Sequence, residues 1–154
     1  SLINLHRHFK GVCLRRLRRL IRGNSLFIPE GVARELRRGT DRLSKFINRE
    51  ADIVVVRLRD NPILQNEIAR MENRYGRSIA IGGVTYQGFW ASQAGRKAAD
   101  SQVVAVARVF GYTVVSDDNA VKLVCALENI PCIGWTEFAR RLGLASAKQL
   151  SLPY

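Results

Sequence analysis

The strongest constraint on the fold is a helix-then-strand pattern that carries acidic residues at both ends. A helical run over residues 99–110 is followed by Gly111 and by a short strand-like run that ends in Asp117 and Asp118. A helix of about a dozen residues and a strand of about five both span roughly 17 Å, so the chain returns to its starting edge. We therefore expect Asp100, at the helix start, to meet Asp117 or Asp118. The carboxyl ends of strands are where open α/β sheets bind ligands.

The rest of the chain alternates helical and strand-like patterns, which predicts an α/β fold with three layers and a mostly parallel central sheet flanked by helices. The length of 154 residues fits one domain over 1–154, with 145–154 as a C-terminal tail. We expect further helices near 5–22, 29–38, 41–47, 61–71, 120–128 and 135–142, and strands at 26–28, 53–56 and 131–133. Residues 75–96 are rich in glycine and have no dominant period, which predicts a long surface loop with at most one short element.

The charge balance is the unusual feature of the composition. Twenty-five basic residues against thirteen acidic residues give a net charge of +12, which favours polyanionic partners: nucleic acid first, an acidic protein second and an anionic membrane surface third. No apolar run approaches 18 residues, so we expect no membrane span and no membrane partner. The three cysteines, Cys13, Cys125 and Cys132, form no CxxC pair, which is typical of reduced core residues in a cytoplasmic protein.

Two more acids are expected at the same edge as Asp100. Glu30 and Glu35 follow the predicted strand at 26–28, so at least one of them projects over its carboxyl end. Crowded carboxylates repel one another unless a cation lies between them, and Mg²⁺ and Mn²⁺ prefer oxygen ligands. The pattern therefore predicts metal-assisted phosphodiester hydrolysis. Each acid also has a structural interpretation, with Asp100 and Asp118 as helix N-caps, Glu30 as a first-turn acid and Glu35 paired with Arg34 or Arg38.

Basic residues gather in two places. One predicted helix face carries Arg15, Arg16, Arg18, Arg19 and Arg22, which suits phosphate contact, docking of an acidic protein, or simple solvation. The second group lies before Asp100 and combines cations with aromatic residues, as in proteins that bind single-stranded nucleic acid by stacking its bases on aromatic rings. Its members are Arg74, Arg77, Tyr86, Phe89, Trp90, Arg96 and Lys97. The alternative is that Phe89 and Trp90 cover the core, and we expect His6 and His8 to be exposed polar residues.

Three segments resemble the PIN-domain family of metal-dependent ribonucleases. Residues 99–107 are similar to the family's "AD..I.A.A" helix, residues 114–118 to its "vvT.D" strand end, and residues 26–36 to its "v.iP..V..El" segment. The resemblance covers most of the chain and is strongest in the last third. It implies a PIN-like fold and an endoribonuclease that hydrolyses RNA phosphodiesters through a metal-activated water, as the toxin of a toxin/antitoxin pair.

The resemblance also assigns the site residues. It places the family's acids on Glu35, in preference to Glu30, on Asp100, and on Asp118 with Asp117 a close second, as both catalytic residues and ligands of Mg²⁺ or Mn²⁺. The partners it implies are RNA and an acidic antitoxin, and a homodimer stays open. The alternative is a catalytically inactive PIN-like module that binds nucleic acid or protein.

The start of the sequence departs from the family pattern. PIN domains open with a strand that ends in an Asp, and residues 1–5 resemble the segment directly after that Asp. Either the sequence begins after this strand or the chain is a variant that lacks one metal ligand. In both cases we expect a gap beside the strand at 26–28, which a partner chain or a rearranged element would fill.

Overall fold

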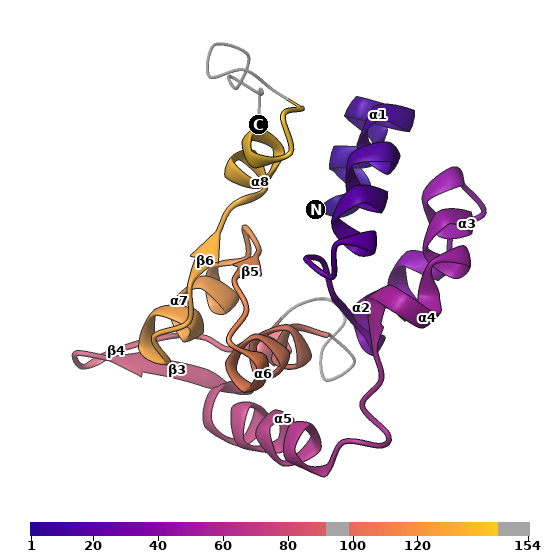
Figure 1. Cartoon of the computed structure of the whole chain (residues 1–154). Coiled ribbons are helices and arrows are strands. Elements are labelled where there is room, and N and C mark those ends of the chain that lie inside the picture. The colour runs from indigo at the N-terminus through magenta and orange to yellow at the C-terminus, as the bar shows by residue number, and fades with distance from the viewer. Residues whose placement is uncertain (92–98, 145–154) are drawn as a thin grey trace.

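The computed structural model describes residues 1–91 and 99–144, which form a mixed α/β structure dominated by helices (Figure 1). The helices are α1 (Leu2–Arg22), α2 (Glu30–Arg37), α3 (Arg42–Arg49), α4 (Ala51–Val54), α5 (Pro62–Tyr75), α6 (Asp100–Phe110), α7 (Asn119–Leu127) and α8 (Trp135–Arg141), with a 3₁₀ turn at Phe89–Ala91. The strands are β1 (Ile28–Pro29), β2 (Val55–Val56), β3 (Ser78–Ile81), β4 (Val84–Gln87), β5 (Val114–Val115) and β6 (Cys132–Ile133). The predicted tail at 145–154 lies outside the described residues.

Local signals set most helix boundaries as expected. Asp41 caps α3 by accepting a hydrogen bond from the Ser44 amide at 2.8 Å. Asn61 caps α5 in the same way, with Pro62 in the first turn, where its missing amide costs nothing. Gly111 ends α6 with a φ of 71°, a conformation that residues with a Cβ atom adopt only at a cost.

The buried side chains form two hydrophobic clusters. One joins α1, α3 and α8 and includes Leu17, Phe46 and Phe138. The other joins α5, α6 and α7 with the β3–β4 hairpin and includes Leu64 and Val104. Cys13 and Cys125 are fully buried in these clusters, as expected of core residues. No helix in the described ranges combines the length and the apolar character that a membrane span requires.

The strands form three separate pairs. β1 pairs with β2 and β5 pairs with β6, both in parallel, with Ile28 opposite Val55 and Val114 opposite Cys132. β3 and β4 form an antiparallel hairpin. The α/β class and the parallel pairing are confirmed, whereas the single central sheet of the three-layer prediction is not formed by the described residues.

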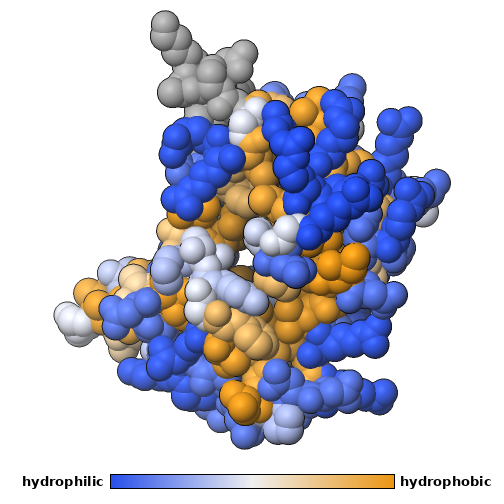
Figure 2. Space-filling view, in the orientation of Figure 1, coloured by the Kyte–Doolittle hydropathy of each residue, from blue (hydrophilic) through white to orange (hydrophobic). Residues whose placement is uncertain are grey.

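An apolar groove of about 560 Å³ lies where a central strand was expected. β1 and β5 both line it, yet neither pairs with the other. Figure 2 shows a corresponding hollow between the α1 and α8 sides of the molecule. The apolar side chains around it include Phe27, Ile28, Val106, Val114, Trp135 and Phe138.

The prediction of a long surface loop at residues 75–96 was wrong. Its first part forms the hairpin of β3 and β4 around Gly82 and Gly83, whose φ values are 54° and 81°. A two-residue turn with positive φ at both positions matches the twist of the strands it joins. The strands have only four residues each, which is too short for a period to stand out. Phe89 is buried behind the hairpin, so its alternative interpretation as a core residue is confirmed.

Two smaller expectations were also wrong. Ile53 and Val54 belong to the short helix α4 and not to a strand, because Val54 packs into the first hydrophobic cluster while the chain bends towards β2. His6 is buried on α1, whereas only His8 is exposed. The helix that carries both is kinked at Lys10, whose φ is 47°.

Candidate functional site

Three carboxylates from three helices gather at one edge of the parallel pairs. Asp100 is the first residue of α6, Asp118 is the N-cap of α7, and Glu35 lies in the last turns of α2. Each of these helices follows or packs on a parallel strand, which brings their ends to the same edge. The sequence-based expectation that Asp100 and Asp118 come together is confirmed, because both line one cavity.

Asp100 is half-buried at the start of α6. Its burial and, to a smaller extent, the negative charges of Asp118 and Glu35 together raise its pKa to about 6. Its predicted alternative as a helix cap is wrong, because Ala99 occupies that position without a side-chain hydrogen bond. Asp118 does cap its helix, since its Oδ1 accepts a hydrogen bond from the Val121 amide at 2.9 Å.

Asp100 and Asp118 line a cavity of about 370 Å³ beside the β3–β4 hairpin. Tyr86 and Gln87 of β4 form another wall of this cavity, and Asn119 lies next to Asp118. Glu35 lines the apolar groove instead. The edge that carries Asp100, Asp118 and Glu35, called here the acidic edge, therefore lies between this cavity and the apolar groove. A ligand in the cavity would reach Asp100 and Asp118 directly.

A contact that the sequence did not predict fixes α2 against α6. The Gly31 amide donates a hydrogen bond to Oε1 of Gln102 at 2.8 Å. A Cβ atom at position 31 would lie 2.6 Å from that oxygen and 2.9 Å from the Cβ of Ala99. Because Gln102 is two residues after Asp100, this close approach positions the start of α6 relative to the helix that carries Glu35. The one sequence signal of this close approach was Gly31 itself, a glycine in the first turn of the helix predicted at residues 29–38.

The other two predicted acids, Glu30 and Asp117, form hydrogen bonds and ion pairs away from Asp100. Glu30 accepts a hydrogen bond from the Leu58 amide at 3.3 Å and forms an ion pair with Arg34 at 3.7 Å. Asp117 accepts a hydrogen bond from the Trp135 amide at 3.3 Å, at the start of α8. The charges that raise the pKa of Asp100 are those of Asp118 and Glu35. This favours Glu35 and Asp118 over their neighbours Glu30 and Asp117 as members of the candidate site.

The residues present fit a divalent metal only in part. Within residues 1–91 and 99–144, no group of three or more His, Cys, Asp or Glu side chains is arranged to hold a metal ion. Mg²⁺, however, keeps several of its waters and is usually held by one or two carboxylates together with substrate phosphates. The oxygen donors of Asp100 and Asp118 match that requirement.

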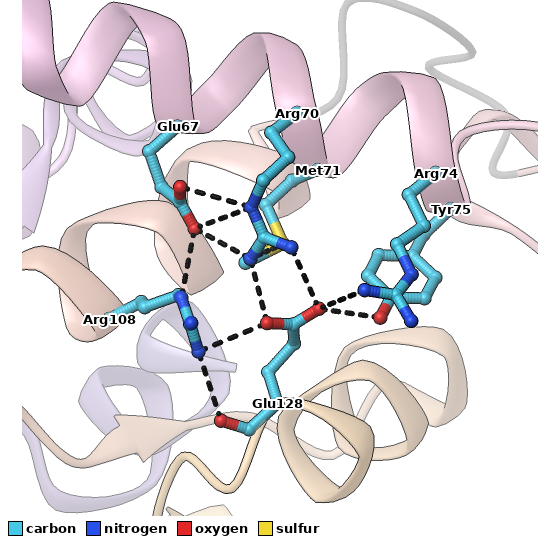
Figure 3. A network of polar contacts seen from close by, with 7 residues as sticks. All are labelled: Glu67, Arg70, Met71, Arg74, Tyr75, Arg108 and Glu128. Carbon is cyan, nitrogen blue, oxygen red and sulfur yellow. Dashed lines mark hydrogen bonds and ion pairs between the residues drawn. The ribbon is translucent and has the colours of Figure 1, made fainter.

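Only two of the four cations predicted to bind nucleic acid near Asp100 lie within the described residues. Arg74 approaches Glu128 at 3.5 Å and lies over the ring of Tyr75, so it belongs to an internal network of charges (Figure 3). Arg77 is exposed at the start of the hairpin. Arg96 and Lys97 lie outside the described residues.

That network centres on Glu128, which sequence analysis did not single out. Its carboxylate lies 2.7 Å from Arg70 and 3.0 Å from Arg108, and it accepts a hydrogen bond from the hydroxyl of Tyr75 (Figure 3). Hydrogen bonding from Arg70 holds the pKa of Glu128 at about 2, against the opposing effect of burial. The network links α5, α6 and the end of α7, and thereby supports the helices that carry Asp100 and Asp118.

Comparisons with curated proteins and with solved structures found no match. A family model described as a domain of unknown function, DUF4411, matches residues 11–145, which include all three carboxylates of the candidate site. The chain therefore belongs to the DUF4411 family.

Proposed function

We propose that this protein is a divalent-metal-dependent endoribonuclease of the PIN type, acting as the toxin of a toxin/antitoxin pair. The observation that carries the proposal is that Asp100 and Asp118 line one cavity, and the negative charges of Asp118 and Glu35 both act on the half-buried Asp100. Such a carboxylate binds a cation more favourably than an isolated one, since the cation relieves the repulsion among the three acids. The net charge of +12 favours RNA as the polyanionic substrate.

The roles of the residues follow from their surroundings. Mg²⁺ or Mn²⁺, when bound, supplies Lewis acidity that activates a water molecule and offsets the charge of the phosphodiester. Asp100 gives up its proton near pH 6 and then serves as an anionic ligand. Asp118 uses Oδ1 to hold the start of α7, and no hydrogen bond among the described residues uses its Oδ2. The Glu35 side chain is exposed, and its carboxylate forms no hydrogen bond or ion pair within that same part of the chain, so it can orient a water molecule or the ribose.

The apolar groove has room for one more strand between the two parallel strand pairs. A parallel strand between β1 and β5 would join the two parallel pairs into the three-layer sheet, with its last residue at the acidic edge. Ser1, Leu2 and Ile3 at the start of α1 line this groove.

The activity is tested by cleavage of a labelled RNA in the presence of Mg²⁺ or Mn²⁺. The substitution Asp100→Asn keeps the shape of the side chain but removes its charge, and we expect it to abolish cleavage. Asp60→Asn is the matched control, because Asp60 is an exposed loop residue remote from α6 in the sequence. Full cleavage by Asp100→Asn would exclude the proposed site.

The second candidate is a catalytically inactive PIN-like module that binds nucleic acid or protein. The observation in its favour is that the described residues hold no group of three metal-ligating side chains. Calorimetric titration with Mn²⁺ separates the two candidates. The nuclease should bind one equivalent of Mn²⁺, more tightly at pH 7.5 than at pH 5.5, because Asp100 must lose its proton first. The binding module should release no heat at either pH.

A further inference from the structure

Helices α1 and α3 carry rows of exposed cations that the proposed cleavage site does not use. On α1 three arginines recur at spacings of four and three residues, and on α3 three cations recur at spacings of three and four. Residues at these spacings lie on one face of a helix, so each helix presents a cationic row to solvent. The six exposed residues, called here the cationic face, are Arg15, Arg19, Arg22, Arg42, Lys45 and Arg49.

The two rows are held beside each other by a contact at the seam between the helices. Nε of Arg18 on α1 lies 3.1 Å from Oε1 of Glu50, the residue that ends α3. The same guanidinium lies over the ring of Phe46 on α3, with its central carbon 5.3 Å from the ring centroid. Figure 2 shows hydrophilic side chains standing together over these helices. The cationic face is therefore a preorganised surface, since its two helices are fixed relative to each other.

The cations of this face are not neutralised within the described part of the molecule. None of the ion pairs there involves any of the six residues. Residues 1–59 contain 15 basic and 5 acidic residues, a balance of +10, whereas residues 60–154 contain 10 and 8, a balance of +2. Nearly all of the net charge thus lies in the segment that builds α1 to α4. An anionic partner would relieve this repulsion.

The surface chemistry indicates what kind of anion binds. A protein interface has an apolar core, but Val12 is the one large apolar residue of α1 and α3 that is exposed in the structure as described. Single-stranded nucleic acid is held by stacking on aromatic rings, but the exposed Tyr and Phe residues in these ranges, Tyr86 and Phe110, belong to β4 and α6, and the exposed His8 of α1 precedes the kink at Lys10. What the face does offer is arginine, whose planar guanidinium pairs with phosphate oxygens in a bidentate manner.

We propose that the cationic face binds the phosphate backbone of base-paired RNA without regard to sequence. The choice of RNA rests on the proposed ribonuclease function, whereas the preference for a helical polyanion rests on this surface alone. The enzyme would then hold a folded RNA by its double-stranded part through α1 and α3, while the acidic edge acts on a neighbouring unpaired segment.

The test measures binding of a 20-base-pair RNA duplex in EDTA, so that the result does not depend on cleavage. The test variant Arg15→Gln, Arg19→Gln, Arg22→Gln removes the α1 row. The control variant Arg57→Gln, Arg140→Gln, Arg141→Gln removes the same charge from arginines paired with Asp52 and Glu137. We expect the test variant to bind about tenfold or more weakly than wild type at 0.1 M salt, with the slope of log affinity against log salt reduced by about 3. The control should bind like wild type.

Several results would overturn this assignment. Equal weakening in both variants would show that only the net charge matters. Single-stranded RNA bound as tightly as the duplex would exclude recognition of a helix, and tighter binding of a DNA duplex would exclude RNA as the intended partner. Displacement of the duplex by poly-glutamate at equal charge would favour an acidic protein. Loss of cleavage in Asp100→Asn with duplex binding intact would support both proposals independently.

Discussion

Replacing Glu128 by Gln tests how much the buried charge network contributes to stability. The Glu128 side chain is 5 % exposed and lies within 3.5 Å of three arginines, Arg70, Arg74 and Arg108 (Figure 3). Removing one partner from a buried ion pair costs about 3–5 kcal/mol, because the remaining charges stay desolvated. The arginine side chains are 36–63 % exposed and Gln keeps one acceptor oxygen, so the lower end applies. We expect the free energy of unfolding to fall by about 3 kcal/mol.

The assay is urea denaturation followed by circular dichroism, with thermal melting as a second measurement. For a chain of this length, 3 kcal/mol corresponds to a melting temperature lower by about 6–12 °C. The pH dependence gives an independent check. The pKa of Glu128 is lowered from 4.5 to about 2 by folding, so its stabilisation is complete above pH 4.5 and is lost as the pH falls towards 2. Wild type and Glu128→Gln should therefore converge in stability near pH 2.

Glu137→Gln is the matched control. Arg140 and Arg141 hold the pKa of Glu137 at about 2 as well, but this cluster lies on the surface of α8. Solvent screens such a pair, so we expect no measurable loss of stability in this variant. If Glu128→Gln and Glu137→Gln unfold at the same urea concentration, the argument that burial makes the network important is refuted.

Two further variants test the acidic edge itself. Folding raises the pKa of Asp100 to about 6, so its ionised form is disfavoured in the native state. At pH 8 we therefore expect Asp100→Asn to be more stable than wild type by about 1 kcal/mol, after allowance for solvent screening. Near pH 4 the two proteins should be equally stable, because Asp100 is then protonated in the folded wild type. Urea denaturation at both pH values checks this, and a constant difference would contradict it. Gly31→Ala should cost about 1–3 kcal/mol by forcing Gln102 and Ala99 apart, whereas the same change at Gly11, which meets only an arginine tip at 3.9 Å, should stabilise α1 slightly.

Sequence patterns predicted the elements whose signals are local. Asp41, Asn61 and Gly111 mark helix ends because each acts on backbone groups a few residues away. The same reasoning placed Asp100 and Asp118 at one edge, since a helix and a strand of matched length return the chain to its start. The hairpin of β3 and β4 was missed although Gly82 and Gly83 carry its turn signal, because the flanking strands are too short to show alternation.

The contacts that give the candidate site its character could not be predicted, because they join residues far apart in the sequence. Arg70 and Glu128 are 58 residues apart, and Gly31 and Gln102 are 71 apart. Neither residue pair has a local pattern that would identify its partner. The sequence likewise indicated strands at 26–28 and 53–56 but not that they would form a pair separate from β5 and β6, since the groove between the pairs depends on the packing of α1, α6 and α8.

The composition of the two hydrophobic clusters has a consequence for the order of folding. The buried members of the cluster around α5, α6 and α7 come from residues 64 to 130, so its contacts are comparatively short in sequence and can form early. The other cluster joins Leu17 of the first helix to Phe138 of the last, and it closes only when nearly the whole chain is present. During synthesis, α1 can pack on α3 and α4 early, but the part of its apolar face that α8 covers stays exposed until α8 is made. Removing α8 by truncation would therefore expose apolar side chains of α1, at the other end of the sequence.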